Sequence, residues 1–205
     1  MRWTDPLPLE TLLKQGQTLG ADFYSRPAEA VARDVIGKVV VHGRTAGRIV
    51  EAEAYLGLAD LAAHASRGFT NRTRVLFGPP GHAYVYLIYG MYECLNVVAG
   101  PEGQAGCVLI RALEPLCGLG IMRRRRPAAR KPEHLCSGPG KLTLAMGITR
   151  ALYGAPVTRG VLTVRTLPAA EPFEIAVSPR IGVNVCADWP LRFYMAGNRF
   201  VSRTR

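Results

Sequence analysis

The chain has 205 residues, 48% of them apolar and 20% charged, a balance that excludes an intrinsically disordered protein. It carries 26 Lys and Arg against 15 Asp and Glu, which gives a formal net charge of +11 with His neutral. So large a positive charge favours a polyanionic partner, nucleic acid ahead of a membrane surface, although a solvated basic surface that only aids solubility is the alternative.

The first part of the chain predicts short helices around one long pair of strands. Residues 1–23 hold scattered prolines and a weak helical pattern, which indicates an N-terminal arm laid over the domain. A helix is predicted over 26–37, because Pro27 suits a first helical position and Gly37 suits a helix end. Within 38–56, β-branched runs on either side of a glycine-containing turn predict two paired strands.

Short helical segments and strands alternate through the rest of the chain. The expected elements are a helix or turn at 59–68 with Asp60 as candidate N-cap, a short helix at 71–78, a hairpin at 84–97, a strand at 106–113, a helix from Pro115 into the RRRRP run at 123–127, a helix after the Gly/Pro turn at 137–140, and strands at 160–167, 173–177, 191–195 and 200–204. Because this order lacks a βαβ rhythm, we predict an α+β fold. It would be one domain, 1–205, around a curved, mostly antiparallel β-sheet with short peripheral helices and a protruding β-hairpin.

The cysteines and histidines bear on compartment and cofactors. The five cysteines are odd in number, widely spaced and without a CxxC pair, so we expect buried free thiols in a reducing compartment. The four histidines lack metal-site spacing, so we expect no catalytic metal and no cofactor. The amino terminus lacks a signal-peptide pattern and no run approaches 18 apolar residues, so we expect neither secretion nor a membrane span.

Two carboxylates share one face of the predicted strand at 47–57. Side chains alternate along a strand, so Glu51, Glu53 and Tyr55 point to the same side. A carboxylate on a mostly apolar face needs an arginine partner or a cleft, and a solvated outer face is the alternative. The strand at 106–113 carries an embedded arginine, Arg111, for which Glu53 or Glu51 would serve as partner. A carboxylate beside a guanidinium group stays ionised and can act as a base toward water, whereas a structural ion pair in the core is the alternative.

The hairpin at 84–97 places tyrosines around its turn. Tyr89 lies at the tip, where it can contribute little to the core, and proteins that bend duplex DNA push such side chains between base steps. Tyr86 would then offer a stacking surface for an extruded base. The alternative is an aromatic cluster packed against a neighbouring loop. The RRRRP run and the SGPGKL segment at 137–142 could contact phosphates, but a solvated helix end and an ordinary helix start explain them equally well.

Six segments in order resemble the motifs of a known family: GRIVEAEAYLG, AAHASRG, LFGPPGHAYVYLIYGMY, CVLIRALEP, CSGPGKL and PRIGV. The chain is similar, over about 24–201, to the alkyladenine (3-methyladenine) DNA glycosylases of the eukaryotic type, which have bacterial members. The resemblance implies a monofunctional enzyme that flips alkylated or deaminated purines out of double-stranded DNA and hydrolyses the N-glycosidic bond. It would leave an abasic site, with no metal and no covalent intermediate.

The resemblance also implies a role for each motif residue. Glu53 would be the general base that activates a water, held by Arg111 and the main chain of Ile181. The walls of the base pocket would be Tyr55, His64 and Tyr86, with Asn96 disfavouring normal guanine, and Tyr89 would intercalate. Glu51 is a candidate second acid. Thr73, where the family has asparagine, and an enlarged loop at 99–106 depart from the pattern.

We therefore expect a monomer acting on damaged DNA in the cytoplasm, at the nucleoid of a bacterium, or in the nucleus of a eukaryote. Two other functions stay open. One is a non-catalytic binder of distorted DNA or structured RNA. The other is a hydrolase of small nucleosides, which the charge and the wedge disfavour.

Overall fold

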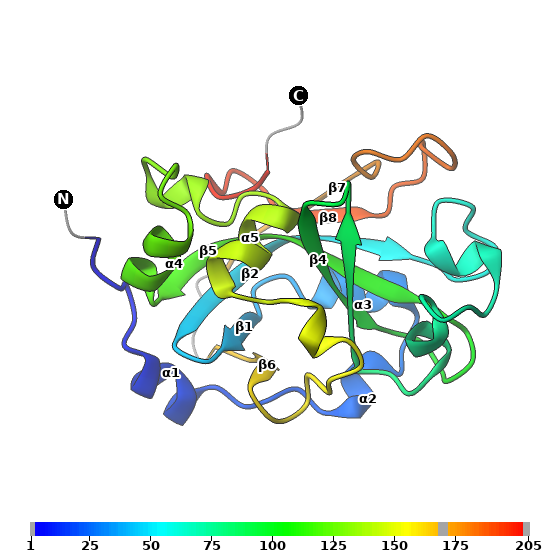
Figure 1. Cartoon of the computed structure of the whole chain (residues 1–205), viewed down its shortest axis with the longest axis horizontal. Coiled ribbons are helices and arrows are strands. Elements are labelled where there is room, and N and C mark those ends of the chain that lie inside the picture. The colour runs from blue at the N-terminus through cyan, green and yellow to red at the C-terminus, as the bar shows by residue number, and fades with distance from the viewer. Residues whose placement is uncertain (1–2, 168–171, 203–205) are drawn as a thin grey trace.

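The computed structural model describes residues 3–167 and 172–202, and its centre is an antiparallel sheet (Figure 1). Within these ranges the strands are β1 (Val39–His42), β2 (Thr45–Tyr55), β3 (Ala83–Ile88), β4 (Tyr92–Val98), β5 (Cys107–Cys117), β6 (Leu162–Arg165), β7 (Ile175–Ser178) and β8 (Arg192–Met195). Their order is β3-β4-β5-β2-β1-β6, with β8 paired to both β2 and β7. The α+β prediction with an antiparallel sheet is confirmed.

Short helices cover both faces of this sheet. They are α1 (Leu9–Gln15), α2 (Ala21–Tyr24), α3 (Ala28–Asp34), α4 (Leu119–Arg125) and α5 (Pro139–Met146), with 3-10 turns η1 (His64–Arg67), η2 (Arg74–Phe77), η3 (Pro132–His134) and η4 (Arg150–Leu152). In Figure 1, α4 and α5 lie on the near face and α3 lies on the far face. Leu12 of α1 packs into a small cluster with Val41 of β1 and Leu116 of β5. No helix in the described ranges is long and apolar enough to span a membrane.

The pairing of β2 with β5 is irregular at Glu51, Ala52 and Arg111. Glu51 is paired with Ala112, and the next residue, Ala52, is paired with Ile110, so Arg111 is left over in the ladder. An extra residue of this kind is a β-bulge, which locally bends a strand and re-aims a side chain. The bulge turns Arg111 toward both glutamates of β2.

The helix predicted to run from Pro115 into the RRRRP run is present, but its predicted start is wrong. β5 continues through Pro115 to Cys117, and α4 begins only at Leu119, after Gly118 with φ of 76°. Pro115 lies opposite Gly47 at a register shift, where the ladder tolerates a residue without an N–H group.

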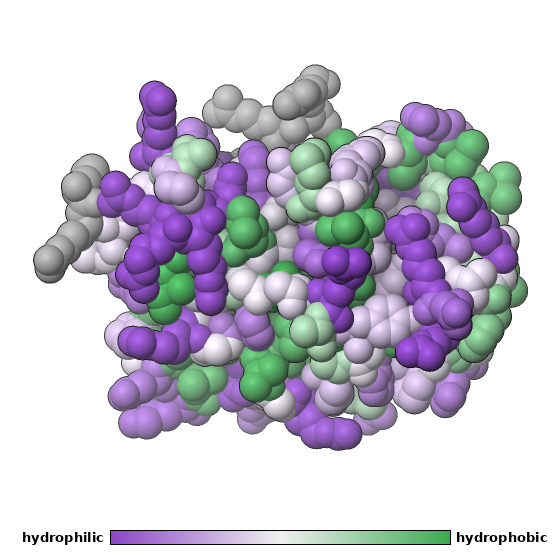
Figure 2. Space-filling view, viewed as in Figure 1, coloured by the Kyte–Doolittle hydropathy of each residue, from purple (hydrophilic) through white to green (hydrophobic). Residues whose placement is uncertain are grey.

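Three of the four arginines in the RRRRP run, most of which are exposed, also contact neighbouring residues. Arg125 donates to the Ala145 carbonyl (3.0 Å), Arg126 donates to the Leu135 carbonyl (2.7 Å), and Arg123 stacks over the Trp3 ring. Figure 2 shows hydrophilic residues gathered over the region of α4. The run therefore joins α4 to its neighbours as well as supplying charge.

The strand expected at 200–204 is absent from the part of it that the structure describes. Residues 200 and 201 are turn and bend, and residues 203 and 204 lie outside the described ranges. Ser202 instead bonds to a buried carboxylate, that of Glu51.

Candidate active site

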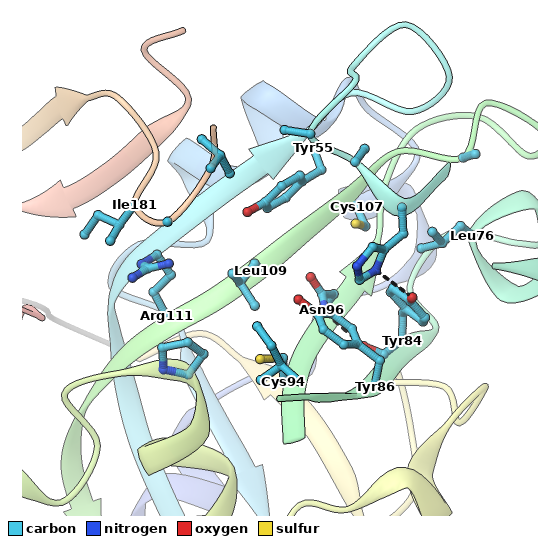
Figure 3. A pocket seen from close by; sticks show the side chains of 18 of the residues that line it. Tyr55, Leu76, Tyr84, Tyr86, Cys94, Asn96, Cys107, Leu109, Arg111 and Ile181 are labelled. Atoms are coloured by element: carbon cyan, nitrogen blue, oxygen red, sulfur yellow. Dashed lines mark hydrogen bonds between the residues drawn. The ribbon is translucent and has the colours of Figure 1, made fainter. Parts of the chain in front are cut away.

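A pocket of about 360 Å³ is lined by residues of β2, β3, β4 and β5 and of the loops that follow β2 and β7 (Figure 3). Its lining residues are Tyr55, Ala62, Ala63, His64, Leu76, Tyr84, Tyr86, Ile88, Tyr89, Cys94, Asn96, Ala105, Cys107, Leu109, Arg111, Pro139, Ile181, Gly182 and Val183. The structure thus brings together seven of the eight residues predicted for the site. The eighth, Glu53, is 0% exposed and lies behind the lining.

Three groups that line the pocket hold the carboxylate of Glu53. The Ile181 N–H donates to Oε1 at 2.7 Å, and a guanidinium nitrogen of Arg111 lies 3.2 Å from the same oxygen. The Tyr55 hydroxyl donates to Oε2 at 3.0 Å. Each partner comes from a different part of the sheet or its loops, so the carboxylate has one fixed orientation beneath the pocket.

Opposing effects act on the pKa of Glu53. Burial raises this pKa above the ordinary carboxyl value, and the negative charge of Glu51 acts in the same direction. Arg111 and the hydrogen bonds from Ile181 and Tyr55 lower it and offset part of the desolvation cost. A base with a raised pKa accepts a proton more readily than an exposed carboxylate does.

Glu51 has a different environment, which does not support its candidacy as a second acid. Its Oε1 lies 2.7 Å from Arg192 Nε and 3.1 Å from Arg111 Nε. The Ser202 hydroxyl donates to Oε1 and the Ser202 N–H donates to Oε2, both at 2.8 Å. Its side chain is buried and does not line the pocket. Glu51 therefore anchors Arg111 from behind.

Aromatic side chains form one side of the pocket. The His64 and Tyr86 ring centroids are 4.6 Å apart, edge to face, and His64 Nδ1 is 2.9 Å from the Tyr84 hydroxyl. Burial, with Arg72 and Arg67 as further causes, lowers the pKa of His64 to about 4. The histidine is therefore neutral at physiological pH, and a purine would meet uncharged rings.

Asn96 of β4 lies at the floor of the same pocket. Its Nδ2 donates to the Tyr84 carbonyl at 3.1 Å, which fixes the plane of the amide (Figure 3). A rigid amide can exclude a base whose exocyclic groups do not fit it.

The hairpin tip presents apolar side chains to solvent. Tyr89 is 80% exposed, and its φ of 52° is followed by a φ of 68° at Gly90. Two consecutive positive φ values fit the tight turn that best joins twisted strands, but a tyrosine in this region costs about 1 kcal/mol. Met91 and Tyr92 are exposed beside it.

The two departures from the family pattern lie in loops near the pocket. Thr73 is buried, accepts a hydrogen bond from the Thr70 N–H (2.9 Å) and donates to the Gly68 carbonyl (2.8 Å), which closes a compact turn. In the loop at 99–106, Ala105 lines the pocket directly.

Sequence reasoning missed a buried ion pair next to the site. Asp60 and Arg180 are joined by two contacts of 2.5 and 2.9 Å, and both side chains are fully buried. Asp60 is not the N-cap of η1, which is Ala63; it accepts instead from the Ala62 N–H in the preceding turn. The pair joins positions 120 apart in sequence, and no local pattern marks it. Within the described part of the chain, no three His, Cys, Asp or Glu side chains lie close enough to hold a metal ion.

Comparison with known proteins identifies the family of the chain. Residues 22–199 match the family model described as Methylpurine-DNA glycosylase, and the chain belongs to this family. A provisionally named 3-methyladenine DNA glycosylase of Methanoculleus marisnigri is 52% identical over 192 residues, covering 91% of this chain and 99% of the relative. Similarly named proteins are 53% identical in Methanocella arvoryzae (90% and 96% covered) and 46% identical in Burkholderia lata (98% and 97% covered). The resemblance drawn from the motifs is confirmed.

Proposed function

We propose that this protein is a monofunctional DNA glycosylase that removes alkylated or deaminated purines from double-stranded DNA as a monomer. The observation that carries the proposal is the carboxylate of Glu53, held by Arg111, Ile181 and Tyr55 directly beneath the pocket. A volume of about 360 Å³ suits one small ligand, and the aromatic wall suits a flat one.

The proposed reaction begins with extrusion of the damaged nucleotide. A base inside a duplex cannot reach a pocket, so the enzyme has to unstack it, at a cost of a few kcal/mol. Tyr89 is suited to fill the gap that the base leaves, since its ring already stands in solvent. The base would then lie against Tyr86 and His64.

Hydrolysis follows at the sugar. The bond between C1′ and the base nitrogen breaks, its electron pair leaves with the base, and C1′ gains positive charge that the nearby carboxylate stabilises. A water held by Arg111 and the main chain of Ile181 adds to C1′ and gives its proton to Glu53. Glu53 is fully buried in the free protein. When DNA binds, the groups that contact the carboxylate therefore have to separate enough for this water to enter between them.

The absence of a lyase step is supported by the lining of the pocket. Glycosylases that also cut the DNA backbone need an amine nucleophile to form a Schiff base. No lysine is among the described residues that line the pocket. We therefore infer an abasic site as the end product.

The test is Glu53→Gln, assayed for base release under single-turnover conditions. The substrates are duplexes with 7-methylguanine, hypoxanthine or ethenoadenine, which include alkylated and deaminated purines. Loss of the base should slow cleavage by a factor of about 10² or more while nanomolar-range binding of the damaged duplex persists. Glu114→Gln, in an ion pair with Arg48 outside the pocket, is the matched control.

Full activity of the Glu53 variant would refute its role as base. No base release by the wild-type protein would favour a non-catalytic binder of distorted DNA. Rapid cleavage of free nucleosides would favour the small-substrate hydrolase.

A further inference from the structure

The Asp60–Arg180 pair lies between the two loops that complete the pocket. Neither residue lines the cavity, yet each belongs to a loop that does: Ala62, Ala63 and His64 follow Asp60, and Ile181 follows Arg180. The pair is the only fully buried salt bridge within the described ranges.

Asp60 organises the loop after β2 on its own side of the pair. Its Oδ2 accepts from the Leu56 N–H and its Oδ1 accepts from the Ala62 N–H, both at 3.1 Å. With Arg180 as a further donor to each oxygen, the carboxylate is fully occupied within the fold. The carboxylate has no free acceptor site for a substrate. It can therefore affect the pocket only by fixing the backbone of the loop that lines it.

Arg180 reaches two of the three groups that hold Glu53. Its guanidinium carbon lies 4.7 Å from the centroid of the Tyr55 ring, and its Nη1 also donates to the Ala54 carbonyl at 3.1 Å. The next residue, Ile181, donates its N–H to Glu53 Oε1. A shift of Arg180 would therefore move both the Tyr55 hydroxyl and the Ile181 N–H relative to the carboxylate.

Stability alone does not account for such a pair. Burying two charges carries a desolvation cost that their attraction roughly offsets, and apolar residues of similar volume often stabilise a protein equally well. A reacting group, by contrast, has to be held within about 0.5 Å of its working geometry.

We infer that Asp60 and Arg180 are a positioning pair for the reaction: they lock the loop after β2 to the loop after β7 and thereby fix Tyr55 and Ile181 on Glu53. This inference rests on the proposed function. It assigns no contact with the substrate to either residue.

The inference predicts a specific effect on the pH profile. The ionisable groups that face Glu53 are Arg111, Glu51, Tyr55 and, through Tyr55, Arg180. Hydrogen bonds from Tyr55 and Ile181 lower the pKa of Glu53, so loosening them raises that pKa. The acidic limb of the pH–rate profile, where the cleavage rate rises as Glu53 loses its proton, should then move to higher pH.

The experiment compares Arg180→Lys and the uncharged double variant Asp60→Asn/Arg180→Gln with wild type. The double variant keeps side chains of similar size that can hydrogen-bond to each other, and it leaves no unpaired charge buried. It therefore still tests the inference if the single variant fails to fold. The measurements are the single-turnover rate against pH on a 7-methylguanine duplex, affinity for a duplex with a non-cleavable abasic analogue, and the melting temperature. We expect a roughly 10- to 100-fold slower reaction and a shifted acidic limb, with affinity changed by less than about threefold.

The matched control is Arg48→Lys in the two-contact pair with Glu114, on the same strand as Glu53 but outside the pocket. An unchanged rate and acidic limb in both pair variants would overturn the inference, as would parallel losses of rate and affinity with an unmoved limb. Glu53→Gln separates the two proposals. If it is inactive while the pair variants behave as wild type, only the positioning role fails; if it is fully active, the proposed function fails and the positioning role with it.

Discussion

Glu51 and Glu53 lie two residues apart on β2 and both contact Arg111, but only Glu53 is bonded to three groups that line the pocket. Glu51 is bonded on its other side to Arg192 and Ser202. One strand therefore carries a carboxylate suited to chemistry and a carboxylate suited to support.

This difference predicts that neutralising Glu51 lowers stability more than neutralising Glu53 does. Glu51→Gln leaves Arg192 and Arg111 buried with one acidic partner fewer, which should lower the free energy of unfolding by about 3 kcal/mol. Glu53→Gln should lower it far less, because Arg111 keeps Glu51. Urea denaturation of both variants tests this, and equal losses would contradict the division of roles.

Tyr55→Phe should shift the acidic limb of the cleavage rate by about one pH unit to higher pH, because it removes a hydrogen bond that lowers the pKa of Glu53. The base form is the deprotonated one, so activity rises with pH through this limb. A 7-methylguanine duplex is the suitable substrate, since its leaving base is already cationic without protonation. Tyr153→Phe, which removes a hydroxyl outside the pocket, is the control. Identical limbs in the two variants would show that the Tyr55 hydroxyl has no influence on the base.

Tyr89→Ser should weaken binding to a damaged duplex by roughly 5- to 100-fold, the loss expected from one stacking contact. Affinity for the single strand should change much less, because no gap has to be filled there. The ring is exposed, so the melting temperature should be nearly unchanged. Val161→Ser, at another exposed apolar position, is the comparison; duplex affinity equal to wild type in the Tyr89 variant would exclude the wedge.

His64 should make stability depend on pH. Its pKa is lowered from 6.5 to about 4 in the folded protein, so between these values the unfolded chain binds more protons. Stability contributed by this residue should therefore rise as pH increases from about 4 to 6.5 and level off above that. His64→Gln should flatten the rise, and Arg72→Gln should reduce it only in part because burial is the larger cause. Melting temperatures measured between pH 4 and pH 6.5 test this prediction. If the melting temperature rises equally steeply with pH in wild type and in His64→Gln, the prediction is wrong.

Alternation along a strand was enough to predict that Glu53, Glu51 and Arg111 belong together, because side-chain direction has a period of two. It could not predict the bulge that re-aims Arg111, since a bulge depends on the register between two strands. The extension of β5 past Pro115 was missed for the same reason: a proline normally ends a ladder, and only the partner strand shows that it sits at a register shift. Nothing in the sequence pairs Asp60 with Arg180, because the ion pair forms only when two distant loops meet.

The bond between Ile181 and Glu53 joins residues 128 apart in the sequence. Contacts of such long range form only after the intervening chain has been ordered, whereas the β1–β2 turn closes locally. During refolding from denaturant, circular dichroism should therefore recover before base release does. A population with the local β1–β2 and β3–β4 hairpins formed and no competent catalytic centre should exist in that interval.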